Sequence, residues 1–146
     1  MSIEIPFFSI LIPSYNRPDE LSRCIGSIIV GPFEDYEIII SDDNSPRKSE
    51  IEAVVQSFGS GGKIRFYQQA SNLKEPDNKN FLVNQARGQF NIILGDDDTL
   101  AKEALSYLYN YIDIEPKSDI YGFGYRVVDE HGGHLSVNRS SRSVHL

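Results

Sequence analysis

The chain has one cysteine, no tryptophan and no excess of positive charge, and these shortages exclude several classes of protein. A lone Cys24 forms no internal disulfide and cannot build a cysteine-based zinc site. The 14 lysines and arginines are outnumbered by 21 aspartates and glutamates, which gives a formal net charge of −7. Because nucleic-acid binding depends on positive charge, we expect no nucleic-acid partner.

Long apolar runs are also missing. No stretch reaches the roughly 20 apolar residues that span a bilayer, and the opening MSIEIPFF has no basic segment followed by an apolar core. We therefore expect no transmembrane segment and no export signal, and a cytoplasmic location, either free or peripheral to the inner face of the membrane. The length of 146 residues predicts a single domain over residues 1–146.

Short apolar runs alternate with amphipathic stretches. The runs predict four strands, at residues 7–13, 36–41, 63–68 and 89–94, and a late strand at 119–129. Helical spacing of apolar residues or helix-start signals predict helices within 21–29, 42–58, 77–87 and 101–112. Continuous aliphatic strands joined by helices predict an α/β fold: a doubly wound, mostly parallel sheet with helices on both faces.

Three loops that follow predicted strands carry unusual polar residues: PSYNR, DDNS and GDDD. In a doubly wound sheet, ligands bind where loops leave the carboxyl ends of the strands. We therefore expect these three loops to lie on one rim.

The first of these loops, PSYNRPDE, contains no glycine, so it matches neither a dinucleotide-binding loop nor a P-loop. Phosphate charge must then be neutralised in another way, and the carboxylates of Asp96, Asp97 and Asp98 can hold Mg²⁺ or Mn²⁺ for this purpose. Tyr15 offers an aromatic face, and base stacking contributes roughly 1–3 kcal/mol. These features together predict a site for a nucleoside diphosphate.

Structural roles compete with this interpretation. Aspartates at strand ends are often helix N-caps, and that alternative stays open for Asp42 and Asp43, whereas capping explains at most one acid of the GDDD loop. A packed rim aromatic is the alternative for Tyr15, and a solvated side chain is the alternative for Lys79.

Four ordered blocks carry a family resemblance: SILIPSYNRPDELSRCIGSII, YEIIISDDNS, NLKEPDNKNFLVNQARGQFNIILGDDD and DIYGFGYRVVDEHGG. They resemble successive blocks of family 2 glycosyltransferases, which have the GT-A fold, a Rossmann-like nucleotide-binding architecture. The resemblance covers nearly the whole chain. It implies that Tyr15, beside Pro13, stacks on the nucleotide base, that Asp43 contacts base or ribose, and that Lys79 approaches the diphosphate.

The resemblance also places the family's D-x-D motif on Gly95, Asp96 and Asp97. It implies that Asp96 belongs to the nucleotide-binding residues and that Asp97 is the ligand of Mn²⁺ or Mg²⁺. The sequence departs from the motif in two ways: Gly95 stands where the motif has its first acid, and an extra acid, Asp98, follows. Either Asp97 or Asp98 can therefore face the metal, and we favour Asp97.

The activity implied by the resemblance is transfer of a sugar, with inversion, from a nucleoside diphosphate sugar to a hydroxyl of a saccharide or lipid-linked acceptor. A UDP-sugar is the favoured donor, and polysaccharide biosynthesis is the usual setting. The family's general base lies in the second half of the domain, whereas this chain stops at Leu146. We therefore expect a chain truncated to the donor-binding part, with the catalytic base outside it.

A non-catalytic nucleotide-sugar-binding module has the same donor half and stays open as an alternative. A phosphoacceptor receiver domain fits less well, because a whole strand–helix unit precedes Asp42 and no lysine follows Lys117. A haloacid-dehalogenase-like phosphatase requires its D-x-D-x-T motif on the first strand, but DDDT follows the fourth.

Overall fold

The computed structural model describes residues 4–59, 61–114, 120–121, 124–129 and 131–138. The chain divides into two compact units, Met1–Tyr107 and Leu108–Leu146. The single domain over residues 1–146 stays a prediction.

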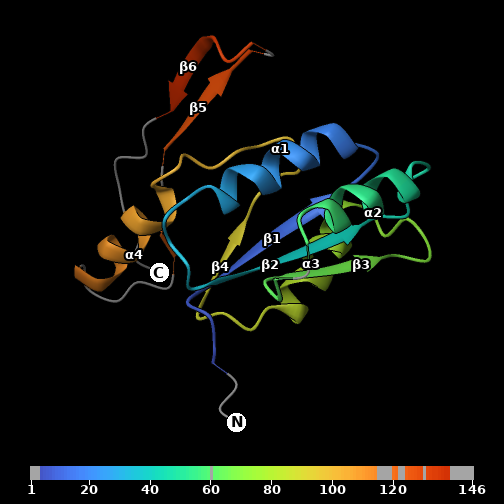
Figure 1. The fold of residues 1–146 in the computed structure, drawn as a ribbon, viewed down its shortest axis with the longest axis horizontal. Coiled ribbons are helices and arrows are strands. Elements are labelled where there is room, and N and C mark those ends of the chain that lie inside the picture. The colour runs from blue at the N-terminus through green and yellow to red at the C-terminus, as the bar shows by residue number, and fades with distance from the viewer. Residues whose placement is uncertain (1–3, 60, 115–119, 122–123, 130, 139–146) are drawn as a thin grey trace. The chain divides into compact units, whose positions relative to one another are not determined.

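Strands and helices alternate along the first unit (Figure 1). Its elements are β1 (Phe8–Ser14), α1 (Pro18–Ile29), β2 (Tyr36–Asp42), α2 (Lys48–Ser57), β3 (Ile64–Gln68), α3 (Glu75–Gln85) and β4 (Phe90–Ile93). Helix α4 (Ala104–Ile114) begins in the first unit and ends in the second, which also contains β5 (Tyr125–Val128) and β6 (His134–Asn138).

The sheet of the first unit has the strand order β3-β2-β1-β4, and all its pairs are parallel. Every residue of β2 is buried, as expected for a central strand covered on both faces. The register between β1 and β2 ends with Ser14 beside Asp42. Tyr15 and Asp43, the next residues, therefore leave the sheet at the same edge, where the Asp43 N–H donates to the Ser14 carbonyl at 2.9 Å.

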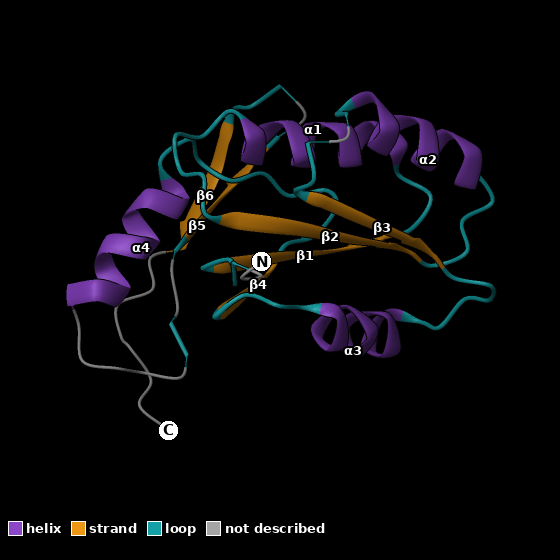
Figure 2. Cartoon of the chain, turned by 60° about the horizontal axis from the view of Figure 1, so that its bottom comes forward, coloured by secondary structure: helices purple, strands orange, loops and turns teal. Residues whose placement is uncertain are grey.

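Helices cover both faces of this sheet: α1 and α2 lie on one face and α3 lies on the other (Figure 2). Helix α1 begins at Pro18, which suits a first turn because its missing N–H has no intrahelical partner there. Its buried face repeats at helical spacing through Leu21, Cys24, Ile25 and Ile28. On the opposite face, Leu82 of α3 packs against Leu11 and Ile39. The predicted α/β fold is confirmed.

The late strand is shorter than predicted, and it has a partner that the sequence analysis missed. Strand β5 pairs with β6 in antiparallel fashion, with a turn in which Gly132 has a φ of +80°. All four residues of β5 are exposed, so no buried alternation marked the hairpin in the sequence. Part of the predicted 119–129 strand lies outside the described residues. Within the described part of the chain, every helix is too short or too polar to cross a bilayer.

Candidate functional site

The three polar loops meet at the carboxyl ends of β1, β2 and β4, as the sequence predicts. The Tyr15 N–H donates to Asp96 Oδ2 at 3.1 Å, which joins the first loop to the third. The Asn16 N–H donates to Ser45 Oγ at 2.7 Å, which joins the first loop to the second. Asn16 has a φ of 58°, a left-handed conformation that asparagine tolerates better than most residues.

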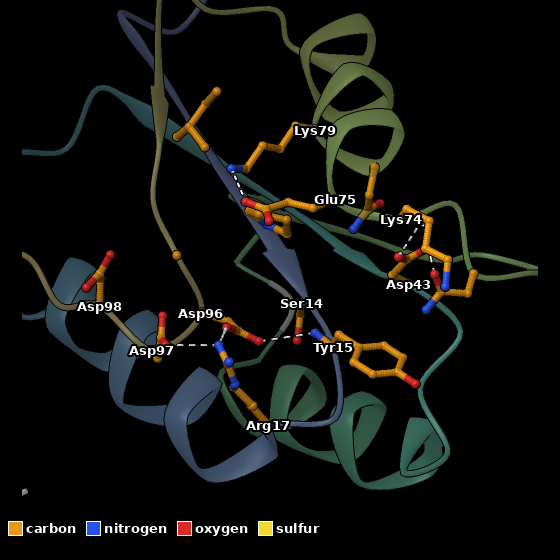
Figure 3. A pocket seen from close by; sticks show the side chains of 15 residues that line it. Ser14, Tyr15, Arg17, Asp43, Lys74, Glu75, Lys79, Asp96, Asp97 and Asp98 are labelled. Atoms are coloured by element: carbon orange, nitrogen blue, oxygen red, sulfur yellow. Dashed lines mark hydrogen bonds and ion pairs between the residues drawn. The ribbon is translucent and has the colours of Figure 1, made fainter.

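These loops and the start of α3 enclose a cavity of about 710 Å³, a size typical of small-molecule sites (Figure 3). All the residues predicted to bind nucleotide or metal line it: Pro13, Tyr15, Asp43, Lys79, Asp96, Asp97 and Asp98. The structure therefore brings the predicted residues together, and their individual roles remain proposals.

Tyr15 is 47% exposed and lines the cavity. Its backbone is fixed by the bond to Asp96, and the next residue is fixed by Ser45. The ring points away from Asp96 (Figure 3). A half-exposed ring on a fixed backbone is a suitable surface for stacking on a planar ligand.

Asp43 is buried, and its carboxylate holds a loop from elsewhere in the chain. Oδ1 accepts the Leu73 N–H at 2.6 Å and Oδ2 accepts the Lys74 N–H at 3.1 Å. Lys74 has a φ of 70°, and these bonds stabilise that strained backbone just before α3. Capping of α2 is excluded for Asp43, because α2 begins after Arg47 without a side-chain cap.

Asp42 has a different structural role from its neighbour. Its carboxylate accepts from the hydroxyl of Ser45 and, at 3.4 Å, from the Ser45 N–H. It is fully buried and does not line the cavity. Asp42 therefore shapes the loop after β2, and it too does not cap α2.

Asp96 is the buried member of the acidic loop, at 4% exposed. Burial raises the pKa of its carboxyl, while the Tyr15 N–H and the Arg17 guanidinium oppose that rise. Arg17 Nη1 lies 3.0 Å from Asp96 Oδ1 and 2.9 Å from Asp97 Oδ2. The hydrogen bond to Asp96 raises the pKa of Arg17 in return.

The absence of a side chain at Gly95 lets two carboxylates approach its backbone closely. A Cβ at this position would stand 3.0 Å from Asp97 Oδ1 and 3.0 Å from Asp98 Oδ2. Carboxylate oxygens are the ligands that Mg²⁺ and Mn²⁺ prefer, so this pair fits a divalent cation. The described residues contain no group of three or more histidines, cysteines, aspartates or glutamates placed to hold a metal. Water and ligand oxygens would therefore complete the coordination, as is usual for Mg²⁺.

Lys79 lines the cavity and forms an ion pair with Glu75 one helical turn earlier. It is therefore not a simply solvated side chain. Because the pair is exposed, it costs little to exchange for another partner.

Sequence reasoning missed two cations that line the cavity, Arg17 and Lys74. Arg17 stood in the quoted PSYNRPDE loop, and a cation on the rim that carries the acidic loop was an available signal. Lys74 immediately precedes the Glu-Pro start of α3, but its exposure to the cavity depends on the Asp43 bonds.

Comparison with known proteins identifies the family. The model of glycosyl transferase family 2 matches residues 9–139, and the chain belongs to this family. A relative, the GalNAc(5)-diNAcBac-PP-undecaprenol beta-1,3-glucosyltransferase of Campylobacter jejuni, is 38% identical over 106 residues, which cover 71% of this chain and 34% of the relative. The chain thus spans about a third of that relative's length.

Solved structures share the fold. TarS 1-349 of S. aureus, in complex with UDP-GlcNAc, has a TM-score of 0.67 at 21% identity. The match covers 83% of this chain and 40% of the TarS chain. The mannosyltransferase PcManGT of Pyrobaculum calidifontis, in complex with GDP-Man and Mn²⁺, has a TM-score of 0.67 at 14% identity. The match covers 80% of this chain and 34% of the PcManGT chain. Both likenesses agree with the GT-A architecture that the sequence resemblance implied.

Proposed function

We propose that this chain is the donor-binding part of a glycosyltransferase and binds a nucleoside diphosphate sugar in the cavity at the carboxyl ends of β1, β2 and β4. The observation that carries the proposal is the convergence, in one cavity, of an accessible aromatic ring, a buried carboxylate, two lysines and an acidic loop. A UDP-sugar is the favoured donor, and the UDP-GlcNAc held by TarS supports this choice.

Tyr15, beside Pro13, stacks on the nucleotide base. Asp43 accepts a hydrogen bond from base or ribose, because each carboxylate oxygen has a lone pair left after binding the backbone of the loop before α3. Lys79 and Lys74 line the same cavity and attract the diphosphate. Asp96 contributes by fixing the Tyr15 backbone.

Asp97 holds the divalent cation, Mn²⁺ or Mg²⁺, with Asp98, whose carboxylate also lies beside Gly95, as the second carboxylate. The Mn²⁺ present in the PcManGT structure supports a metal of this type. When bound, the cation supplies Lewis-acid stabilisation of the negative charge on the departing diphosphate. The chain itself holds the acidic loop against the end of β1, through the hydrogen bond from the Tyr15 N–H to Asp96.

The reaction that we propose for the whole protein is inverting transfer of the sugar to a hydroxyl of a saccharide or lipid-linked acceptor, in polysaccharide biosynthesis on the cytoplasmic side. A base must deprotonate that hydroxyl, and we assign no residue of this chain to the task. A non-catalytic nucleotide-sugar-binding module would have the same donor site, and sugar transfer by the full-length protein separates the two.

Calorimetric titration tests the donor site. We expect UDP to bind the chain in the presence of Mn²⁺, GDP to bind more weakly, and Asp97→Ala to abolish the metal-dependent part of the affinity. Glu103→Ala, which changes an exposed acid outside the cavity, is the control. Absence of binding by UDP and GDP alike, or binding that ignores both Mn²⁺ and Asp97, would refute the proposal.

A further inference from the structure

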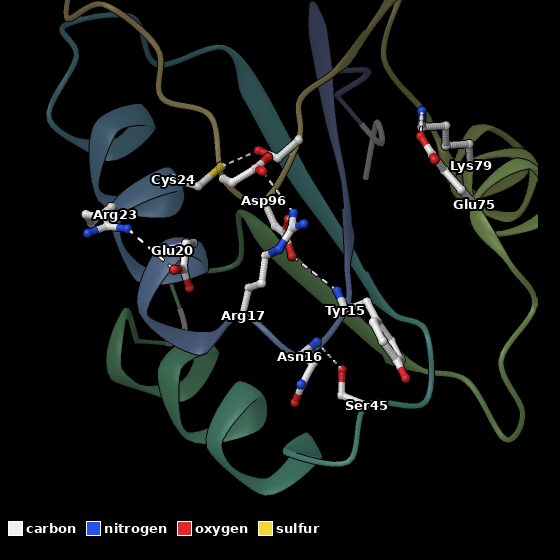
Figure 4. A network of polar contacts seen from close by, with 12 residues as sticks. Tyr15, Asn16, Arg17, Glu20, Arg23, Cys24, Ser45, Glu75, Lys79 and Asp96 are labelled. Atoms are coloured by element: carbon white, nitrogen blue, oxygen red, sulfur yellow. Dashed lines mark hydrogen bonds and ion pairs between the residues drawn. The ribbon is translucent and has the colours of Figure 1, made fainter. Parts of the chain in front are cut away.

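One guanidinium nitrogen joins two of the rim acids. Arg17 Nη1 lies within 3.0 Å of a carboxylate oxygen of Asp96 and within 2.9 Å of one of Asp97 (Figure 4 shows its bond to Asp96). We propose that Arg17 is the resident counter-cation of this rim: it holds Asp97 while no metal is bound, gives Asp97 up to a divalent cation, and then binds the donor's diphosphate. This inference rests on the donor site proposed above and adds a residue that couples its two ligands.

The two acids that Arg17 bridges differ in how firmly they are held. The Asp96 side chain is 5% exposed, and its second oxygen accepts the Tyr15 N–H. The Asp97 side chain is 54% exposed, and among the described residues its carboxylate has a hydrogen bond or ion pair with Arg17 alone. Asp96 is therefore the fixed anchor of the guanidinium, and Asp97 is the partner that can be exchanged.

Asp97 presents its two oxygens to different neighbours. Oδ2 faces Arg17, while Oδ1 lies on the Gly95 side, where an oxygen of Asp98 also approaches the Gly95 backbone. A divalent cation bound to Oδ1 and a guanidinium bound to Oδ2 would be two positive charges on one carboxylate. Their repulsion favours the exchange, so Arg17 lowers the metal affinity of the nucleotide-free chain.

The released guanidinium has a second use in the same cavity. The Arg17 side chain is 51% exposed and lines the cavity together with Lys74 and Lys79. A guanidinium binds two phosphate oxygens at once in a planar geometry, which an ammonium group cannot do. Arg17 therefore opposes metal binding in the empty site and supports it once a diphosphate is present.

This double role predicts effects of opposite sign for one substitution. Arg17→Gln removes the competitor and the phosphate contact together. We expect Mn²⁺ to bind the nucleotide-free variant about fivefold more tightly, the size expected on removing a competing surface ion pair. UDP, with Mn²⁺ saturating, should bind about tenfold or more weakly because a charge-assisted bond to phosphate is lost.

The experiment measures free Mn²⁺ by electron paramagnetic resonance, without nucleotide, and then UDP affinity by calorimetry. Arg23→Gln is the matched control: Arg23 lies on α1, is 68% exposed, pairs with Glu20 at 3.7 Å and does not line the cavity (Figure 4). It removes the same charge from the helix that Arg17 immediately precedes, so it corrects for the general electrostatic effect. Arg17→Lys, which retains the charge, should restore most of the competition and only part of the UDP affinity.

A merely structural role for Arg17 would make both affinities fall, and that result overturns the inference. It is also overturned if Mn²⁺ binds Arg17→Gln and Arg23→Gln equally, or binds neither of them nor the parent chain. If UDP still binds with Mn²⁺ in those cases, the proposed donor site stands and only the role of Arg17 fails. If no nucleotide binds any variant, the proposed function itself fails.

Discussion

The carboxylate of Asp96 accepts the backbone N–H of Tyr15 at 3.1 Å, across 81 residues of sequence. This bond joins the end of β4 to the end of β1 and fixes the residue proposed to stack on the nucleotide. The acidic loop and the Tyr15 backbone are therefore structurally coupled, and a substitution that moves one should also move the other.

The Asp96–Tyr15 bond can be isolated by comparing two substitutions. Asp96→Asn keeps an oxygen that accepts the Tyr15 N–H, whereas Asp96→Ala leaves that N–H without its acceptor. We expect Asp96→Ala to be less stable than Asp96→Asn by about 1–3 kcal/mol in urea unfolding. Asp98→Ala, at an exposed acid, should stay within about 0.5 kcal/mol of the parent chain. Equal stability of the two Asp96 variants would contradict the bond's importance.

Burial gives Asp96 a pH dependence of a definite sign. Its folded pKa is raised, so the folded chain binds the proton more tightly than the unfolded chain does. The free energy of unfolding therefore gains from this residue at low pH and loses that gain as pH rises from the ordinary aspartate value of about 3.9 through the folded pKa. Asp96→Asn should lack this component. Identical pH profiles for the two chains would show that the folded pKa is not raised.

Tyr15→Ala should weaken UDP binding by roughly 1–3 kcal/mol, the contribution of one base stacked on an aromatic ring. Binding of free pyrophosphate should not change, because the ring has no part in it. Tyr15→Phe retains the ring and should retain the affinity. Tyr107→Ala, at a tyrosine that is 74% exposed and outside the cavity, is the control. An equal loss of UDP and pyrophosphate affinity would rule out stacking.

Gly95→Ala places a methyl group against the two carboxylates proposed to hold the metal. Asp97 and Asp98 must turn aside, because the new Cβ would approach an oxygen of each to 3.0 Å. We expect the Mn²⁺ affinity in the presence of UDP to fall by about tenfold, equivalent to about 1.4 kcal/mol. Gly61→Ala, where nothing lies within 4 Å of the added Cβ, serves as the control. Unchanged Mn²⁺ affinity would place the metal elsewhere.

At the other end of β2, Glu37 supports the fold through a buried polar network. Burial by itself would raise the pKa of Glu37, but bonds from Ser9, the Arg87 N–H and Arg65 outweigh it and lower the pKa. Arg65 Nη2 lies 2.9 Å from Glu37 Oε2, and the Arg87 N–H donates to Oε1 at 2.8 Å. The network ties β1, β2, β3 and the loop before β4 together.

Because the folded pKa of Glu37 is lowered, its stabilising effect is present above the ordinary glutamate value of about 4.3 and is lost as pH falls through the folded pKa. Glu37→Gln should reduce the free energy of unfolding by about 1–3 kcal/mol at pH 7. The difference from the parent chain should shrink on acidification. Glu52→Gln, at an exposed helical glutamate, is the matched control. A difference that grows at low pH would contradict the assignment.

The sequence predicted the central sheet well because buried parallel strands consist of continuous aliphatic runs, such as the triple isoleucine of β2. It also predicted the shared rim, since the topology alone brings the ends of β1, β2 and β4 to one edge. It did not predict which partner each acid selects. Asp43 binds a loop 30 residues away, and Asp96 binds Tyr15 and Arg17, because these choices depend on side-chain positions in three dimensions. The exposed β5–β6 hairpin carried no burial pattern to find.

The most direct test of the donor site is nuclear magnetic resonance of this 16.5 kDa chain with UDP and a trace of Mn²⁺. A bound paramagnetic ion broadens amide signals near it, so it maps the site without relying on activity. We expect UDP and Mn²⁺ together to broaden the amide signals of Gly95, Asp97 and Asp98 most strongly, and UDP to shift those of Tyr15 and Asp43. Broadening centred on any other part of the chain, or none with UDP present, would contradict it.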